Sequence, residues 1–258
     1  MKTIVLANQK GGVGKTTTTF ALSSELGQIG YKVLAIDGDP QGNLSYLSTN
    51  KENTKTLEDV LEGKAEIKEA ISISTAGYFD IIGGAWSLSD ADRRFTGAFD
   101  YMLLKKALRG IKGDYDYCVI DSPPNLGILG VNYLTAADYV VVPVNPCAFS
   151  LQGLTCINDV ITNIRENANP DLKVAGILLT RVIKRAKIYE ASKEITSKLA
   201  NVFNTIVFDT TIRQSVNVGT SQFEKQSLLN YGKYKGVAGD YRDFTKELLN
   251  VIGGGKNE

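Results

Sequence analysis

The stretch that decides the fold of this chain is residues 9–18, Gln9-Lys10-Gly11-Gly12-Val13-Gly14-Lys15-Thr16-Thr17-Thr18. An apolar run at 2–8 precedes it and a helical pattern follows, which is the context of a phosphate-binding loop. The glycines let backbone N–H groups converge on phosphate oxygens, and the start of the helix adds partial positive charge. Lys15 is expected to reach the β- and γ-phosphates, and the Thr16 hydroxyl to ligate Mg²⁺. The alternative is a glycine turn that merely joins a strand to a helix.

Acidic residues follow two further apolar runs. Asp37 ends the run at 32–37 and Asp39 follows it with one residue between them, so two carboxylates lie at the end of one strand. We therefore expect Asp37 near Mg²⁺, through a coordinating water, and Asp39 to orient and polarise the attacking water. Asp121 ends the run at 117–121 and is expected to be a second carboxylate at the metal. A strand-ending turn is the alternative interpretation of the first pair.

The pattern along the chain predicts an α/β fold. Strands are expected at 2–8, 32–37, 79–83, 117–121, 139–144, 174–180 and 205–208, and helices at 16–28, 100–109, 128–137, 151–166, 189–200 and 241–251. The apolar runs are continuous, as in strands covered on both faces. We expect a single-domain P-loop NTPase over 1–252, with a mostly parallel twisted sheet and helices on both faces, and a flexible tail over 253–258.

Composition excludes several classes of function. The chain has 29 basic and 28 acidic residues, so its net charge is nearly zero. Binding to nucleic acid or to a membrane would therefore need a local basic patch. Histidine is absent, which excludes imidazole metal sites and Ser-His or Cys-His nucleophile pairs. The three cysteines have no C-x-x-C spacing, and no apolar run approaches the ~18 residues of a membrane span. A soluble, cytosolic protein without disulfides is expected.

These clusters together resemble the ParA/MinD family of P-loop ATPases, which carry a deviant Walker A motif. The mark of that motif is an extra lysine at the start of the loop, here Lys10. Within the family the chain is similar to ParA/Soj-type DNA partition ATPases, through Asp37-Gly38-Asp39-Pro40-Gln41-Gly42-Asn43, Asp121-Ser122-Pro123-Pro124 and Ile212-Arg213-Gln214-Ser215. The resemblance covers nearly the whole chain. It implies an ATPase that uses ATP and Mg²⁺, with Lys10, Lys15 and Asp39 as catalytic residues.

The resemblance also implies how the nucleotide is held. Lys10 would reach across a dimer interface to the phosphates of the partner subunit, where a second cation neutralises the departing phosphoryl group. ATP would thus join two subunits and hydrolysis would release them. The nucleotide contacts that we expect are Lys10, Gly11, Gly12, Val13, Gly14, Lys15, Thr16 and Thr17, with the adenine near Arg181, Thr211, Ile212 and Arg213.

Partition ATPases of this kind bind DNA of any sequence, which requires lysines and arginines that contact phosphates. The expected patch comprises Arg181, Lys184, Arg185, Lys187 and Arg213, with Lys193 and Lys198 further along the chain. A solvated loop and helix face is the alternative interpretation of these charges. No helix-turn-helix pattern precedes the first expected strand, so operator-specific binding is not expected. The family implies slow turnover that a ParB-type centromere-binding partner stimulates, and a cytoplasmic, nucleoid-associated location.

Four other functions are alternatives for a chain with this loop. A MinD-like ATPase that positions cargo at a membrane surface would need an amphipathic basic helix at the C-terminus, but the charges of 240–251 are mixed. An iron–sulfur ATPase needs converging thiolates. A tyrosine kinase of the same superfamily needs more tyrosines than Tyr231, Tyr234 and Tyr241, which suit ordinary packing. An adaptor that binds nucleotide without hydrolysis is disfavoured by the presence of Asp39.

Overall fold

The centre of the molecule is a sheet, which we describe from a computed structural model. The structure describes residues 1–49, 55–146, 150–183, 189, 194, 196–198, 200–201, 203–232 and 235–253. Within these residues, seven strands pair in the order β3-β4-β2-β5-β1-β6-β7. Their bounds are β1 Lys2–Leu6, β2 Val33–Asp37, β3 Ile71–Ile73, β4 Asp80–Ile82, β5 Tyr117–Asp121, β6 Tyr139–Val144 and β7 Lys173–Leu179. Every pairing is parallel except that of β3 with β4.

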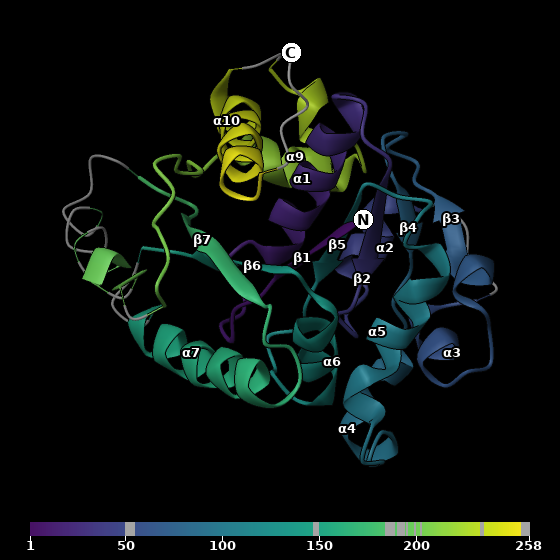
Figure 1. Cartoon of the computed structure of the whole chain (residues 1–258). Coiled ribbons are helices and arrows are strands. Elements are labelled where there is room, and N and C mark those ends of the chain that lie inside the picture. Colours follow the sequence, from purple (N-terminus) through teal and green to yellow (C-terminus); the bar gives the residue numbers. More distant parts are fainter. Residues whose placement is uncertain are drawn as a thin grey trace.

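Helices cover both faces of the sheet. The α-helices are α1 Lys15–Gln28, α2 Asn43–Ser48, α3 Leu57–Leu61, α4 Ala91–Arg94, α5 Leu103–Leu108, α6 Ile128–Ala136, α7 Ser150–Asn167, α9 Val216–Phe223 and α10 Gly236–Val251. Short 3₁₀ helices are η1 Ile67–Ala70, η2 Trp86–Asp90, η3 Asp100–Met102, η4 Arg109–Ile111 and η5 Leu228–Asn230. In Figure 1 the helices α1, α9 and α10 lie above the sheet, and α3 to α7 lie below it.

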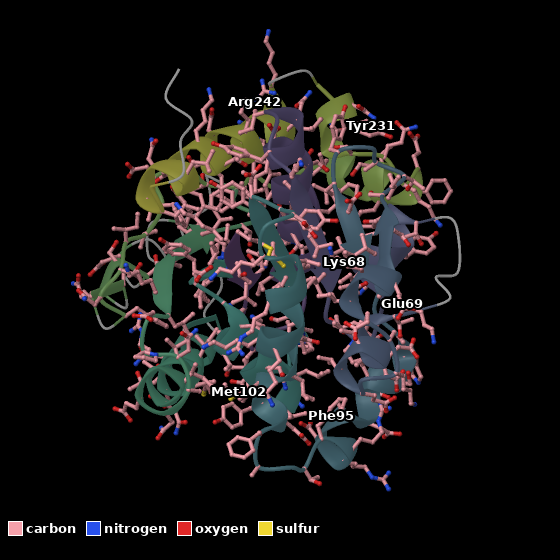
Figure 2. The ribbon with its side chains drawn as sticks, turned by 45° about the vertical axis from the view of Figure 1, so that its right-hand side comes forward. Lys68, Glu69, Phe95, Met102, Tyr231 and Arg242 are labelled. Carbon is pink, nitrogen blue, oxygen red and sulfur yellow. The ribbon has the colours of Figure 1, made fainter. Side chains whose placement is uncertain are left out.

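Each face has its own apolar core. Phe20 of α1 and Phe244 of α10 belong to one core. This core also contains alternate side chains of two strands, Ile4 and Leu6 of β1 and Val33 and Ala35 of β2. Leu104 of α5, Tyr133 of α6 and Ile157 of α7 belong to the other. Figure 2 shows the two ends of this three-layered arrangement, with Arg242 of α10 at the top and Phe95 and Met102 at the bottom. The predicted α/β fold with helices on both faces is confirmed.

The register of the central strands positions the site. Leu6 of β1 pairs with Asp121 of β5, and Asp37 of β2 pairs with the same Asp121. The three strands therefore end level with one another, at the edge where parallel sheets bind ligands. The loop at 9–14 leaves β1 at this edge, so it meets both acidic strand ends although they lie far along the chain.

Several predicted elements differ from those observed. The stretch 205–208 forms only an isolated parallel bridge, Ile177 with Val207, because its backbone leaves the edge of β7 after one pairing. β3 was missed because three residues are too short to show a period. α10 begins at Gly236, five residues before the predicted start, since two glycines in its first turn obscured the pattern. Half of the predicted helix at 189–200 lies outside the described residues, as does the predicted tail at 253–258 except for Gly253.

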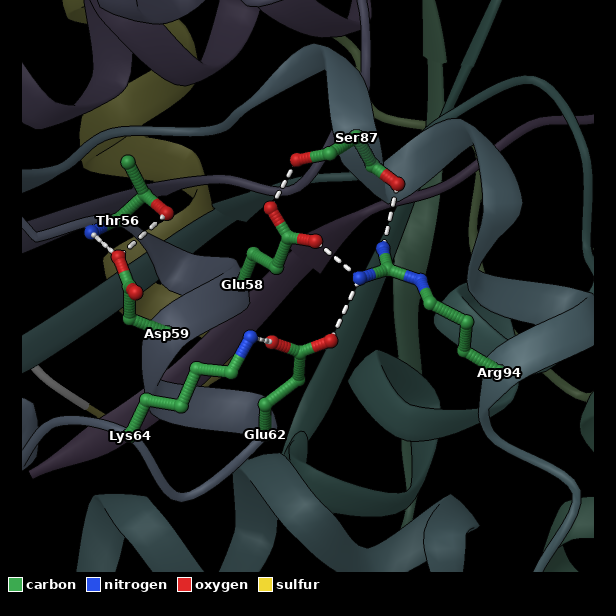
Figure 3. Close-up of polar contacts among 7 residues, drawn as sticks. All are labelled: Thr56, Glu58, Asp59, Glu62, Lys64, Ser87 and Arg94. Atoms are coloured by element: carbon green, nitrogen blue, oxygen red, sulfur yellow. Dashed lines mark hydrogen bonds and ion pairs between the residues drawn. The ribbon is translucent and has the colours of Figure 1, made fainter.

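A polar cluster joins the segments below the sheet. The Arg94 guanidinium contacts the carboxylates of Glu58 on α3 and of Glu62 directly after it, and the carbonyl oxygen of Ser87 on η2, as Figure 3 shows. Thr56 and Asp59 form a capping box at the start of α3. Most of these atoms lie near solvent, so the ion pairs orient α3 and α4 more than they stabilise them.

Candidate active site

The predicted phosphate-binding loop has the backbone that phosphate binding requires. Gly14 precedes α1 with φ 88°, in the left-handed region that favours glycine, and its carbonyl oxygen accepts the first bond of the helix from Thr18. Gly11 and Gly12 are exposed, whereas Val13 is buried. The loop and the first residues of α1 line an open cleft. Such a loop and helix start bind anions through the partial positive charge of their backbone N–H groups.

The start of the loop is fixed by a buried asparagine. The Asn8 side chain donates to the Pro143 carbonyl oxygen of β6 at 2.7 Å and accepts the backbone N–H of Lys10 at 2.9 Å. The Lys10 carbonyl oxygen in turn accepts a long hydrogen bond from the Lys15 ammonium at 3.4 Å. The backbone of Lys10 is therefore held on both sides. Sequence reasoning missed Asn8 as a contributor, because an amide at a strand end carries no signal of its own.

Lys15 lies inside the protein although it carries a charge. Its exposed fraction is 6%, and burial lowers the pKa of its ammonium, while Asp121 and Asp39 oppose that shift. A desolvated cation attracts phosphate oxygens more strongly than one in water. The predicted role of Lys15 as the phosphate lysine fits this position.

Asp37 is the most firmly held carboxylate of the site. One oxygen accepts from both the backbone N–H and the hydroxyl of Ser45, at 2.7 and 2.6 Å, and the other accepts from the backbone N–H of Asp39 at 3.3 Å. The side chain is fully buried, and burial raises its pKa to about 6 despite these donors. Such a carboxylate suits a water-mediated contact with the metal, because its own lone pairs are already largely used.

Asp121 has the opposite character. It is fully buried, and neither of its carboxylate oxygens has a hydrogen-bond partner among the described residues. Burial and the charge of Asp37 raise its pKa well above the usual range, and the nearby Thr16 hydroxyl and Lys15 ammonium only partly oppose this. A buried carboxylate whose oxygens have no partner within hydrogen-bond distance can accept a cation.

These residues fit Mg²⁺. The described residues contain no group of three Cys, Asp or Glu side chains that could enclose a metal ion by themselves. Magnesium does not need such a cage, because it is usually held by one or two carboxylates, waters and the phosphates of its nucleotide. Thr16, Asp121 and Asp37 would hold it here, and bound Mg²⁺ would neutralise charge on the terminal phosphates.

Asp39 faces the cleft. It is 8% exposed and lines the cavity together with Lys15, Thr16 and Thr17. One of its oxygens accepts the backbone N–H of Gln41 at 3.0 Å, which leaves the other available for a water. Asp37 is thus turned toward Ser45 whereas Asp39 lines the cleft, and the division of roles between them stays a prediction.

The cleft has a volume of about 730 Å³, and its far wall comes from the C-terminal part of the chain. Of the four residues expected near the adenine, Arg181, Ile212 and Arg213 line it, whereas Thr211 lines a separate cavity of about 360 Å³ beside Phe208. Sequence reasoning missed α9 as part of this wall. Its Gln222 side chain donates to the Thr17 hydroxyl at 3.1 Å, which links α9 to the phosphate-binding loop.

The expected DNA-binding residues are only partly described. Lys184, Arg185, Lys187 and Lys193 lie outside the described residues. Arg181 is exposed, and its guanidinium donates to the Gly12 carbonyl oxygen at 3.1 Å. Arg213 forms a bidentate ion pair with Asp240 of α10, with two bonds of 2.7 Å. Lys198 pairs with Glu194 on an exposed helix face. Arg181 and Arg213 thus line the same cleft, and each guanidinium is hydrogen-bonded to another part of the protein.

Several described residues bear on the alternative functions. Phe244, Leu248 and Leu249 of α10 are buried against the sheet, as expected of a helix packed on the domain. In the part of the chain that the structure describes, every helix is too short or too polar to cross a membrane. Cys118 is fully buried in β5, where burial raises the pKa of its thiol. Tyr241 is buried and its hydroxyl shares a hydrogen bond of 3.3 Å with that of Thr18.

Comparison with known proteins agrees with this geometry. A model of a family described as AAA domain matches residues 1–174. The chain is 33% identical over 250 residues to the sporulation initiation inhibitor protein Soj of Bacillus subtilis, which covers 96% of this chain and 98% of that one. It is 37% identical over 256 residues to the chromosome partitioning protein ParA of Caulobacter vibrioides, with 97% and 94% covered. The crystal structure of cobyrinic acid a,c-diamide synthase from Mycobacterium smegmatis with bound ADP and magnesium has a TM-score of 0.83 at 28% identity, over 99% and 97% of the two chains.

Proposed function

Because the chain belongs to the AAA domain family, and within it to the Soj/ParA partition ATPases that use ATP and Mg²⁺, we propose that it is a dimerising switch that partitions DNA. In the ATP state two subunits bind face to face and associate with DNA of any sequence. Hydrolysis, stimulated by a ParB-type centromere-binding protein, releases them. The cargo is plasmid or chromosomal DNA, and the protein acts in the cytoplasm on the nucleoid.

One observation carries the ATPase part of this proposal. Asp37 of β2 and Asp121 of β5 are register partners in the sheet and lie beside the phosphate-binding loop. The loop and Lys15 bind the phosphates, and Thr16 with the two carboxylates holds Mg²⁺. Asp39 orients the attacking water, since it lines the cleft while Asp37 is held by Ser45. Lys10 acts in trans on the nucleotide of the partner subunit, and its fixed backbone supports such a reach.

DNA binding is supported by the position of Arg181, the first residue of the basic segment 181–187. Arg181 contacts the loop at Gly12, and Lys184, Arg185 and Lys187 follow within six residues. A change in the loop on ATP binding would therefore reach the start of the basic segment directly. Phosphate contacts by lysine and arginine are sufficient for binding without sequence preference.

The test is cosedimentation with random-sequence duplex DNA, in ATP and in ADP, at low and moderate salt. We expect binding only in ATP, with a steep loss as salt rises, because released counterions drive it. The double variant Arg185→Glu/Lys187→Glu should weaken DNA binding and leave dimerisation intact. The matched control is Lys106→Glu/Lys112→Glu, which makes the same change in charge at two exposed lysines elsewhere. If both doubles bind DNA like the wild type, the patch lies elsewhere, for example around Lys225 and Lys235.

The switch itself is tested by Asp39→Ala. We expect ATP to hold this variant as a dimer, since bound ATP is no longer hydrolysed, and size-exclusion chromatography with light scattering measures the mass. Hydrolysis at the wild-type rate would show that another group orients the water. If the protein does not bind DNA in either ATP or ADP, the leading alternative is a MinD-like ATPase that positions cargo at a membrane surface or on another protein.

A further inference from the structure

Tyr133 of α6 is a fully buried tyrosine that reaches the acidic turn of the site from below the sheet. Its exposed fraction is 0%, and its hydroxyl donates to the Gly38 carbonyl oxygen at 2.9 Å. Gly38 is the residue between Asp37 and Asp39. A single hydrogen bond therefore joins the body of α6 to the peptide that connects the two carboxylates.

Gly38 and Tyr133 fit together closely. A Cβ atom on Gly38 would lie 2.5 and 2.6 Å from two atoms of the Tyr133 ring and 2.7 Å from the Asp121 carbonyl oxygen. Real Cβ atoms do not approach so near, so the turn can lie here only because residue 38 has no side chain. The Gly38 N–H donates to that same Asp121 carbonyl oxygen at 2.9 Å. Both polar groups of Gly38 are thus bound, one to β5 and one to α6.

The chemistry of the tyrosine suits this position. Burial, with the charges of Asp37, Asp39 and Asp121, raises the pKa of the Tyr133 hydroxyl well above its usual range. The group therefore stays protonated at any physiological pH and remains a donor. A lysine here would add a positive charge that competes with Mg²⁺ for the carboxylates, whereas a phenol donates without one.

We propose that Tyr133 is a positioning residue for hydrolysis, which holds the turn 37–39 so that Asp39 faces the attacking water. Tyr133 does not touch the nucleotide; it acts through the Gly38 peptide. Asp37 is held separately by Ser45, so loss of the Tyr133 bond frees the Asp39 side of the turn first. The proposal rests on the role of Asp39 given under the proposed function.

The test compares Tyr133→Phe with Tyr115→Phe. Both variants lose one hydroxyl and one hydrogen bond, since the Tyr115 hydroxyl donates to Asp80 at 2.7 Å, remote from the acidic turn. We expect Tyr133→Phe to lower kcat about tenfold, the low end for groups that orient a reacting residue. Its affinity for a fluorescent ATP analogue should stay within about twofold of the wild type, because no phosphate contact is lost. Tyr115→Phe should change neither.

The outcomes separate the possible explanations. If Tyr133→Phe keeps the wild-type kcat, Tyr133 only fills space and the proposal is wrong. If kcat and ATP affinity fall together, or if Tyr115→Phe loses as much kcat, the effect is one of general packing and the proposal is also overturned. Asp39→Ala is measured alongside: wild-type hydrolysis in that variant would refute the role of Asp39, whereas loss of hydrolysis in Asp39→Ala together with wild-type kcat in Tyr133→Phe would refute only the link between Tyr133 and Asp39.

Discussion

The hydroxyl of Thr180, the residue that follows β7, donates to the carbonyl oxygen of Val13 in the phosphate-binding loop at 2.8 Å. The two residues are 167 positions apart, and Thr180 is almost fully buried. Its methyl and hydroxyl groups also lie 3.9 Å from where a Cβ on Gly14 would be. The end of β7 therefore supports the loop from the side opposite the two acidic strands.

Thr180→Val tests this support. Valine keeps the shape of threonine but leaves the Val13 carbonyl oxygen without its donor, so the loop is held less firmly. We expect ATP to bind about five- to tenfold more weakly, which corresponds to the loss of one hydrogen bond of ~1 kcal/mol. Titration with a fluorescent ATP analogue measures this. The matched control is Thr245→Val, which removes an equally short buried hydrogen bond to Tyr241 within α10 and should leave ATP binding unchanged.

Lys15→Ala should weaken ATP binding severely. The variant loses a desolvated cation that no other described side chain of the cleft replaces at that point. A hydrogen bond to a charged group is worth about 1.5–3 kcal/mol, so affinity should fall by roughly 10- to 100-fold. Lys198→Ala, which removes an exposed lysine, serves as the control. ATP affinity equal to the wild type in Lys15→Ala would contradict the assignment of the phosphate lysine.

Asp121→Asn should make the protein more stable and less active. Burial disfavours the charged form of the Asp121 carboxyl group and raises its pKa, whereas asparagine carries no charge, so unfolding by urea without nucleotide should require about 1 kcal/mol more. The same change weakens the metal site, so hydrolysis should need a higher concentration of MgCl₂. Loss of activity with an unchanged dependence on MgCl₂ would argue against a metal contact by Asp121.

Glu25→Gln should change how stability depends on pH. Glu25 of α1 faces Arg242, Lys246 and Asp243 of α10; its side chain is 2% exposed, and burial raises its pKa above the usual 4.5, against the opposing charge of Arg242. The folded state therefore binds this proton more tightly than the unfolded chain, and the wild type loses stability as the pH rises from 4.5 through the raised value.

Glutamine cannot ionise, so this variant should lack that loss and be more stable than the wild type at pH 7.5, with the difference shrinking toward pH 4.5. Urea unfolding at several pH values measures it. A variant that is less stable than the wild type at pH 7.5 would show that the 3.5 Å pair of Glu25 with Arg242 outweighs the cost of burial.

Local chemistry let the sequence predict much of this protein. Glycines at fixed spacing before a lysine and a threonine predicted the phosphate-binding loop, because its shape depends on neighbouring residues alone. Continuous apolar runs between helical patterns predicted a parallel sheet, and six of its strands are observed. Asp37 and Asp121 were found because each ends such a run. The strand at 205–208 failed because a short apolar segment at an edge pairs only as far as its neighbour allows.

The tertiary structure alone decided which distant groups meet. The equal ends of β2 and β5 put Asp37 beside Asp121, although 83 residues separate them in the chain. The hydrogen bonds of Thr180 to Val13 and of Tyr133 to Gly38 depend on how β7 and α6 pack. No spacing in the sequence encodes either contact. Sequence patterns report the preferences of neighbouring residues, whereas the partner of a buried polar group is set by the packing of whole elements.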